Sequence, residues 1–179
     1  DAHRQLVGKI EKENSLFYGG APTKKMHPHN LLPSYILNWF ESIFKHYLAF
    51  NKINEYKLAM QSIWVNEMIA GEYNPIHIHQ GSIYTGLSSV MILKLPKDMG
   101  PEYARPDVKT NGKLQIIGAA NGQFVKSDFS PVLEERNFYI FPYDMRHCVY
   151  PHTNPNAVRR TLAANMDVHY NPVSTRTAG

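Results

Sequence analysis

The sequence predicts a mainly β protein, a double-stranded β-helix (jelly roll) with N-terminal helices packed on it. One amphipathic helical pattern lies in the first third of the chain, and seven short apolar runs follow it. Turn-forming Gly, Pro, Asn and Asp residues separate these runs, which is typical of an all-β sandwich or barrel. No helical pattern separates the later runs, and this argues against a doubly wound parallel sheet.

The helical pattern runs from Ser34 to about Asn51. Its apolar side chains recur at spacings of three and four residues, which predicts an amphipathic helix. Pro33 stands where the start of a helix tolerates proline. The preceding segments 18–22 and 27–30 contain Gly and Pro and are predicted as loops.

The texture of the sequence changes after Lys52. Short runs rich in Ile, Val, Tyr and Phe predict strands at 59–68, 76–79, 87–95, 113–119, 137–141, 148–150 and 159–168. The segment 97–112 is rich in Pro, Asp and Gly and is predicted as a loop near the site described below.

Length and composition suit one folded domain. The chain has 179 residues, of which 43% are hydrophobic and 12% aromatic. We predict a single domain over 1–179, with 1–58 as helical N-terminal support and 59–170 as the jelly-roll core. No apolar run reaches the roughly 18 residues of a membrane helix. A single cysteine, Cys148, excludes an internal disulfide and a multi-cysteine zinc site.

The net charge of +4 is spread along the chain. No basic stripe interleaved with aromatic residues is present, so nucleic-acid binding is not indicated. We expect a small-molecule or peptide substrate and no membrane partner, and the oligomeric state stays open. The sequence starts without Met and without a signal or transit peptide, so we expect a processed start and a cytoplasmic location.

Nine histidines stand out in this chain, because histidine is the commonest metal ligand. His77 and His79 are two residues apart, so on a strand both rings would face one cavity. His147 follows a Phe-Pro turn and begins the next apolar segment. The pair alone also suits histidines on a surface or in a polar core.

A second feature lies in the last predicted strand. Arg159 and Thr161 share one face of it, and a buried guanidinium is costly without an anionic partner. The two side chains could hold a carboxylate. The alternative is an internal ion pair of Arg159 with Glu134 or Asp167.

These features, in this order, resemble the iron(II)/2-oxoglutarate-dependent oxygenases, and in particular a subgroup of small hydroxylases of phage and bacterial type. The resemblance covers residues 60–168, and Arg159 lies twelve residues after His147, as the family pattern requires. The motifs that carry it are Trp64-Val65-Asn66, Asn74-Pro75-Ile76-His77-Ile78-His79-Gln80-Gly81, Phe141-Pro142, His147-Cys148-Val149-Tyr150-Pro151, and Arg159-Arg160-Thr161 with Asn165.

The resemblance implies an oxidoreductase that uses Fe(II), 2-oxoglutarate and O2. Its metal ligands would be His77, His79 and His147, with no catalytic residue beyond the metal site. Arg159 and Thr161 would bind the far carboxylate of 2-oxoglutarate, and Asn66 could reach the cosubstrate or its water. The expected reaction is hydroxylation of a substrate with release of succinate and CO2, in the host cytoplasm for a phage-encoded member.

One departure from the family pattern leaves two ligand sets open. The usual triad has two histidines and a carboxylate, and here His79 holds the carboxylate position. Either all three histidines bind iron, or His79 is the first ligand and Gly81 occupies the carboxylate position, with water or halide in the vacancy. Asp144 is a weaker candidate because it lies in a predicted turn.

Two other functions remain possible from the sequence. A cupin-type dioxygenase with three histidines and no 2-oxoglutarate would explain His79, but it leaves Arg159 and Thr161 without a role. A non-catalytic jelly-roll binding module would bind zinc or no metal at these histidines.

Overall fold

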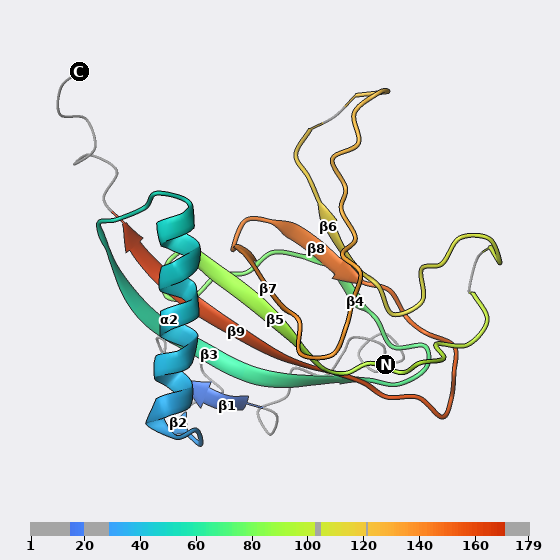
Figure 1. Cartoon of the computed structure of the whole chain (residues 1–179), viewed down its shortest axis with the longest axis horizontal. Helices are drawn as coiled ribbons and strands as arrows, with labels where there is room; N and C mark the ends of the chain where they lie inside the picture. The colour runs from blue at the N-terminus through green and yellow to red at the C-terminus, as the bar shows by residue number, and fades with distance from the viewer. Residues whose placement is uncertain (1–14, 20–28, 103–104, 121, 171–179) are drawn as a thin grey trace.

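The computed structural model describes residues 15–19, 29–102, 105–120 and 122–170. Within these residues it contains one helix, α2 (Ser34–Phe50), and nine strands (Figure 1). The strands are β1 (Ser15–Tyr18), β2 (His29–Asn30), β3 (Tyr56–Met68), β4 (Asn74–His77), β5 (Gly86–Lys94), β6 (Leu114–Ile117), β7 (Phe138–Pro142), β8 (Arg146–Val149) and β9 (Arg159–Tyr170).

The strands form two antiparallel sheets. The large sheet has the order β2-β1-β3-β9-β5-β7, and the small sheet has the order β4-β8-β6. From β3 to β9, consecutive strands alternate between the large and the small sheet. This alternation confirms the predicted mainly β jelly roll.

Most predicted elements are present. Each of the seven predicted strands overlaps one of β3 to β9, and α2 begins at Ser34 directly after Pro33. The loop predictions at 18–22 and 27–30 are wrong at Tyr18, which belongs to β1, and at residues 29–30, which form β2; residues 20–22 and 27–28 lie outside the described residues. These two short strands exist because β1 adds to the edge of β3, with Phe17 opposite Ile63, and β2 adds to β1. The pairing of β1 with β3 joins residues more than forty positions apart, which leaves no local signal in the sequence.

Helix α2 covers one face of the large sheet (Figure 1). Its buried side chains Phe40, Phe44 and Leu48 share a core cluster with residues of β3, β5 and β9. The cluster's members on these strands are Ile63, Leu87, Ala164, Met166 and Val168. No helix in the described part of the chain is long and apolar enough to span a membrane.

The opposite face of the large sheet points toward the small sheet. On β9, Ala164 and Met166 belong to the helix-side core, so the alternate residues Arg159 and Thr161 face the other way. Between the two sheets lies a cavity that both residues line. Strand alternation therefore separates an apolar helix-side core from a polar inter-sheet face.

Candidate metal centre

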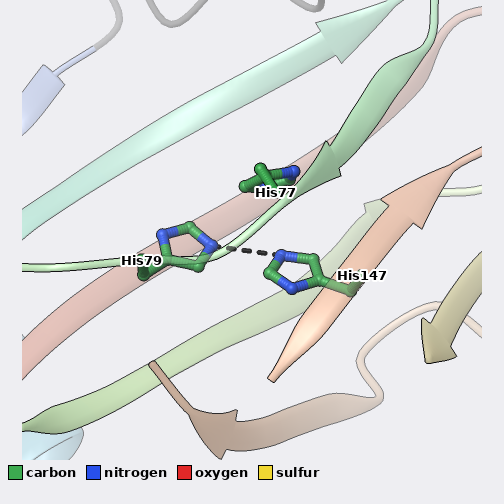
Figure 2. Close-up of side chains that lie close together, drawn as sticks. All are labelled: His77, His79 and His147. Atoms are coloured by element: carbon green, nitrogen blue, oxygen red, sulfur yellow. Dashed lines mark hydrogen bonds between the residues drawn. The ribbon is translucent and has the colours of Figure 1, made fainter. Parts of the chain in front are cut away.

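Three histidines from distant parts of the sequence lie together in this cavity (Figure 2). His77 is the last residue of β4 and pairs directly with His147 of β8, so both side chains project from the same face of the small sheet. His79 follows two residues later. The candidate ligand nitrogens of the three rings all lie within 4.8 Å of one another.

The predicted alternation around the histidine pair is present, although β4 ends at His77. Ile76 and Ile78 are 63% and 54% exposed, whereas His77 and His79, which alternate with them, line the cavity. Beyond the end of β4, the backbone N–H of His79 donates to the carbonyl of Tyr143, at 2.9 Å. This bond extends the strand-like geometry to the third histidine.

Backbone carbonyls orient two of the rings. The Nδ1 atom of His77 is 2.7 Å from the Pro75 carbonyl oxygen, and that of His147 is 2.9 Å from the Met145 carbonyl oxygen. With Nδ1–H donating to a carbonyl, Nε2 of each ring carries the lone pair. This arrangement is the usual one for metal-binding histidines.

The cavity keeps the rings uncharged. Burial, with additional repulsion from His147 and His77, lowers the pKa of His79 to about 3. Burial also lowers the pKa of His147 to about 4, although the Met145 carbonyl opposes this shift. At neutral pH both rings are neutral, which is the form that binds a metal.

The spacing of the rings fits a shared metal ion. Nε2 of His79 lies 3.1 Å from Nε2 of His147, as the dashed line in Figure 2 shows. Two imidazole nitrogens bound to one metal at about 2.1 Å each can be separated by such a distance. No carboxylate joins the three histidines in the cluster formed by the described residues.

The space around the cavity that no atom fills is about 570 Å³, a figure that includes open solvent. The cavity brings the other predicted residues to the histidines: on paired strands β3 and β9, Asn66 lies opposite Thr161 and Met68 lies opposite Arg159. Asn66, Arg159 and Thr161 all line the cavity. The Asn66 side-chain oxygen is buried and has no hydrogen-bond partner among the described residues.

Arg159 is buried without an anionic partner. Its side chain is 2% exposed, and Nη1 contacts only the Met68 sulfur, at 3.8 Å. Nε and Nη2 have no partner in the described part of the chain. Burial lowers the pKa of Arg159 to about 10, so the guanidinium is still charged at neutral pH. A buried, unpaired cation next to a cavity makes an anion-binding site.

No internal ion pair of Arg159 is present among the described residues. Asp167 accepts hydrogen bonds from Ser82, Ile83 and Tyr143 instead of from Arg159. Glu134 forms no ion pair among the described residues.

The weaker ligand candidates lie elsewhere. Gly81 packs against Asp167 and Gln61, and a Cβ atom at this position would lie 1.9 Å from Oδ1 of Asp167. It does not line the cavity, and Asp144 is exposed in the turn between β7 and β8. The loop predicted at 97–112 approaches the anion site, because a Cβ atom on Gly112 would lie 3.8 Å from Cδ of Arg159.

Some cavity residues have no role in the sequence prediction. Ser88 and Ser89 line the cavity from β5, and two small polar residues within the apolar run 87–95 were an available signal. Asn74 lines it from β4, next to the histidine motif. Trp64 is buried and also lines the cavity, with its ring centroid 6.1 Å from that of His79.

A protein family described as "Putative 2OG-Fe(II) oxygenase" has a model that matches residues 62–165, more than half of the chain. The chain belongs to the 2OG-Fe(II) oxygenase family. The matched span of this oxygenase contains the three histidines, Arg159 and Thr161. Members of the family generally use Fe(II), 2-oxoglutarate and O2, and the neutral histidines and the unpaired arginine fit a metal ion and an anion.

Solved structures show the same fold. An oxidoreductase of the 2OG-Fe(II) oxygenase family from Burkholderia pseudomallei is 13% identical, with a TM-score of 0.56, and the match covers 86% of this oxygenase and 63% of that chain. AviO1 from Streptomyces viridochromogenes Tue57 is 13% identical, with a TM-score of 0.51 and coverage of 87% and 73%. The oxygenase thus spans less than two thirds of the Burkholderia protein. No curated protein matches its sequence.

Proposed function

We propose that this oxygenase is an Fe(II)- and 2-oxoglutarate-dependent dioxygenase that hydroxylates a small-molecule or peptide substrate and releases succinate and CO2. The observation that carries the proposal is one cavity that holds both three convergent histidines and a buried arginine with no anionic partner among the described residues. A metal site alone suits many activities. The buried Arg159 in the same cavity favours a cosubstrate that binds the metal at one end and carries a carboxylate at the other.

His77, His79 and His147 would hold the iron. Three neutral ligands leave the ion's full double positive charge in the cavity, whereas the usual triad with a carboxylate removes one unit of it. This extra charge favours a dianionic cosubstrate. When bound, Fe(II) together with 2-oxoglutarate and O2 supplies the oxidative chemistry, and the chain supplies position and a largely buried cavity.

Arg159 and Thr161 would bind the carboxylate of 2-oxoglutarate that is far from the metal. The guanidinium can donate to it in bidentate fashion, and the buried Thr161 hydroxyl lies on the same face of β9. Asn66, opposite Thr161 on β3, has a free side-chain oxygen that would accept a hydrogen bond from a bound water.

One observation favours a second candidate. A histidine at the carboxylate position is the ligand set of a three-histidine, cupin-type dioxygenase that does not use 2-oxoglutarate. In such an enzyme Arg159 would stay unpaired in the cavity at a cost of several kcal/mol. The two candidates differ in whether 2-oxoglutarate is consumed.

The deciding experiment is an anaerobic titration of the purified protein with Fe(II) and then 2-oxoglutarate. We expect a visible metal-to-ligand charge-transfer band that appears only when both are present, and formation of succinate after O2 is admitted. Iron binding without this band and without succinate would support the cupin-type candidate. Failure to bind iron would contradict both.

The Arg159→Ala variant tests the anion site. We expect 2-oxoglutarate to bind at least about 30-fold more weakly, because truncating one partner of a buried charge pair costs about 2 to 5 kcal/mol, while Fe(II) affinity changes little. Arg160→Ala is the matched control, since Arg160 is exposed and pairs with Glu67. Equal losses of iron and cosubstrate in Arg159→Ala would contradict the assigned role.

A further inference from the structure

We infer that Asp167 and Tyr143 are positioning residues of the metal centre, which fix the segment 79–83 and thereby the place of the His79 ring. This inference rests on the proposed metal-binding role of the three histidines. It concerns two residues that contact neither the proposed metal nor the proposed cosubstrate.

His79 is the histidine with the weakest support of its own. His79 lies beyond the end of β4, whereas His77 and His147 belong to paired strands. Carbonyl oxygens hold Nδ1 of His77 and His147, but none in the described part of the chain holds Nδ1 of His79. The direction of the His79 ring therefore depends on how its backbone is held.

Asp167 holds the backbone that follows His79. This β9 residue is completely buried, and its Oδ2 accepts hydrogen bonds from the backbone N–H groups of Ser82, at 2.9 Å, and Ile83, at 3.3 Å. Gly81 lies directly against Oδ1, where no side chain would fit. A buried carboxylate without hydrogen-bond donors is costly in free energy. The turn at 81–83 is therefore held in the conformation that points its N–H groups at Asp167.

Tyr143 joins this turn to the rest of the site. Its hydroxyl donates to Oδ1 of Asp167 at 3.1 Å, its carbonyl accepts from the N–H of His79 at 2.9 Å, and its own N–H donates to the Gly86 carbonyl at 3.0 Å. It is 1% exposed and precedes His147 by four residues, in the connection between β7 and β8. One side chain and its backbone thus link the segments that carry His79 and His147.

The test uses Co(II) as the probe, with Tyr143→Phe and Asp167→Asn as variants. We expect Co(II) to bind about 10- to 100-fold more weakly, the range typical of outer partners of a metal site. We also expect a changed visible ligand-field spectrum, which a loss of global stability alone would not produce. Tyr139→Phe on β7 is the matched control: it removes a hydroxyl that donates to the Val132 carbonyl and should leave affinity and spectrum unchanged.

A double-mutant cycle shows whether the effect passes through His79. In the His79→Ala background, Tyr143→Phe should have no further effect on Co(II) affinity, since the ring that it positions is gone. An undiminished effect in that background would overturn the inference.

Metal binding by the wild-type protein distinguishes a failure of this inference from a failure of the proposed function. Wild-type protein that binds Co(II), with both variants equal to it in affinity and spectrum, would overturn the inference and leave the proposed function intact. Wild-type protein that binds no Co(II) and no Fe(II) would overturn the proposed function and the inference together. Tyr143→Phe removes a single oxygen atom and keeps the test decisive if Asp167→Asn fails to fold.

Discussion

Arg159 carries the largest unmet electrostatic demand among the described residues. Among the described residues, Nη1 donates only to the Met68 sulfur, and Nε and Nη2 have no hydrogen-bond partner. An uncompensated buried ion costs several kcal/mol, so the cosubstrate-free protein stores a penalty that a dicarboxylate would relieve. Binding of a dicarboxylate beside Arg159 is therefore the property that separates the 2-oxoglutarate-dependent candidate from the cupin-type candidate.

At neutral pH the buried histidines have a predictable effect on stability. The pKa values of His79 and His147 in the folded protein are about 3 and about 4, below the value of about 6.5 for an unfolded chain. Between these values the unfolded chain binds more protons, so the free energy of unfolding falls as the pH falls. We expect the metal-free protein to lose stability from about pH 6.5 down to about pH 3, measured by denaturant unfolding.

The control for this pH dependence is the double variant His79→Asn/His147→Asn. It lacks the two buried titrating rings and should show a smaller loss of stability over the same pH range. Equal pH dependence of the two proteins would show that other groups govern the acid sensitivity.

Among the elements, β9 contributes most to the site. It pairs with both β3 and β5, and its alternate residues face opposite layers. Ala164, Met166 and Val168 face helix α2, while Arg159, Thr161 and Asp167 share the opposite face. Strand β9 therefore carries Arg159 and Thr161 near its start and Asp167, which holds the turn after His79, near its end.

The tight fit of the turn against β9 predicts the effect of Gly81→Ala. The new Cβ atom would lie 1.9 Å from Oδ1 of Asp167, so the turn must shift, at a cost of about 1 to 3 kcal/mol. Gly122→Ala is the control, since its Cβ atom would approach the Val125 side chain at 3.1 Å. We expect the control to change the free energy of unfolding by less than about 0.5 kcal/mol in urea denaturation.

Elements with strong local patterns were predictable from the sequence. The spacing of Phe40, Phe44 and Leu48 indicates helix α2, and the apolar runs with flanking turn residues indicate β3 to β9. The metal cluster and Arg159 were predictable as candidates because a short motif carries each of them. Their convergence in one cavity required the structure.

The anchor formed by Tyr143 and Asp167 was not predictable. Tyr143 and Asp167 are 24 positions apart, and Ser82, which donates to Asp167, lies 85 positions before it. No local sequence pattern indicates such contacts. The same reason explains why β1 was missed, since its pairing with the distant strand β3 places it in the sheet, and β2 is a strand only through its pairing with β1.

At the scale of the whole molecule, the division into one domain over 1–179 stays a prediction. Two tryptophans allow a direct test, because Trp39 lies on α2 at the helix layer and Trp64 lies in the cavity wall. Fluorescence of the Trp39→Phe and Trp64→Phe variants should give unfolding curves of the same cooperativity, each coincident with its own circular dichroism curve. Separate transitions at the two probes would contradict a single domain.

The cross-strand pairing of His77 with His147 has a further consequence for the small sheet. Strand β4 is a four-residue edge strand, and its outward side carries the exposed Ile76. Exposed apolar edges are where sheets recruit other chains and aggregate. A metal ion bound by His77 and His147 would hold β4 onto β8 across this pair. The proposed metal would then stabilise the pairing of the edge strand as well as the position of the histidines.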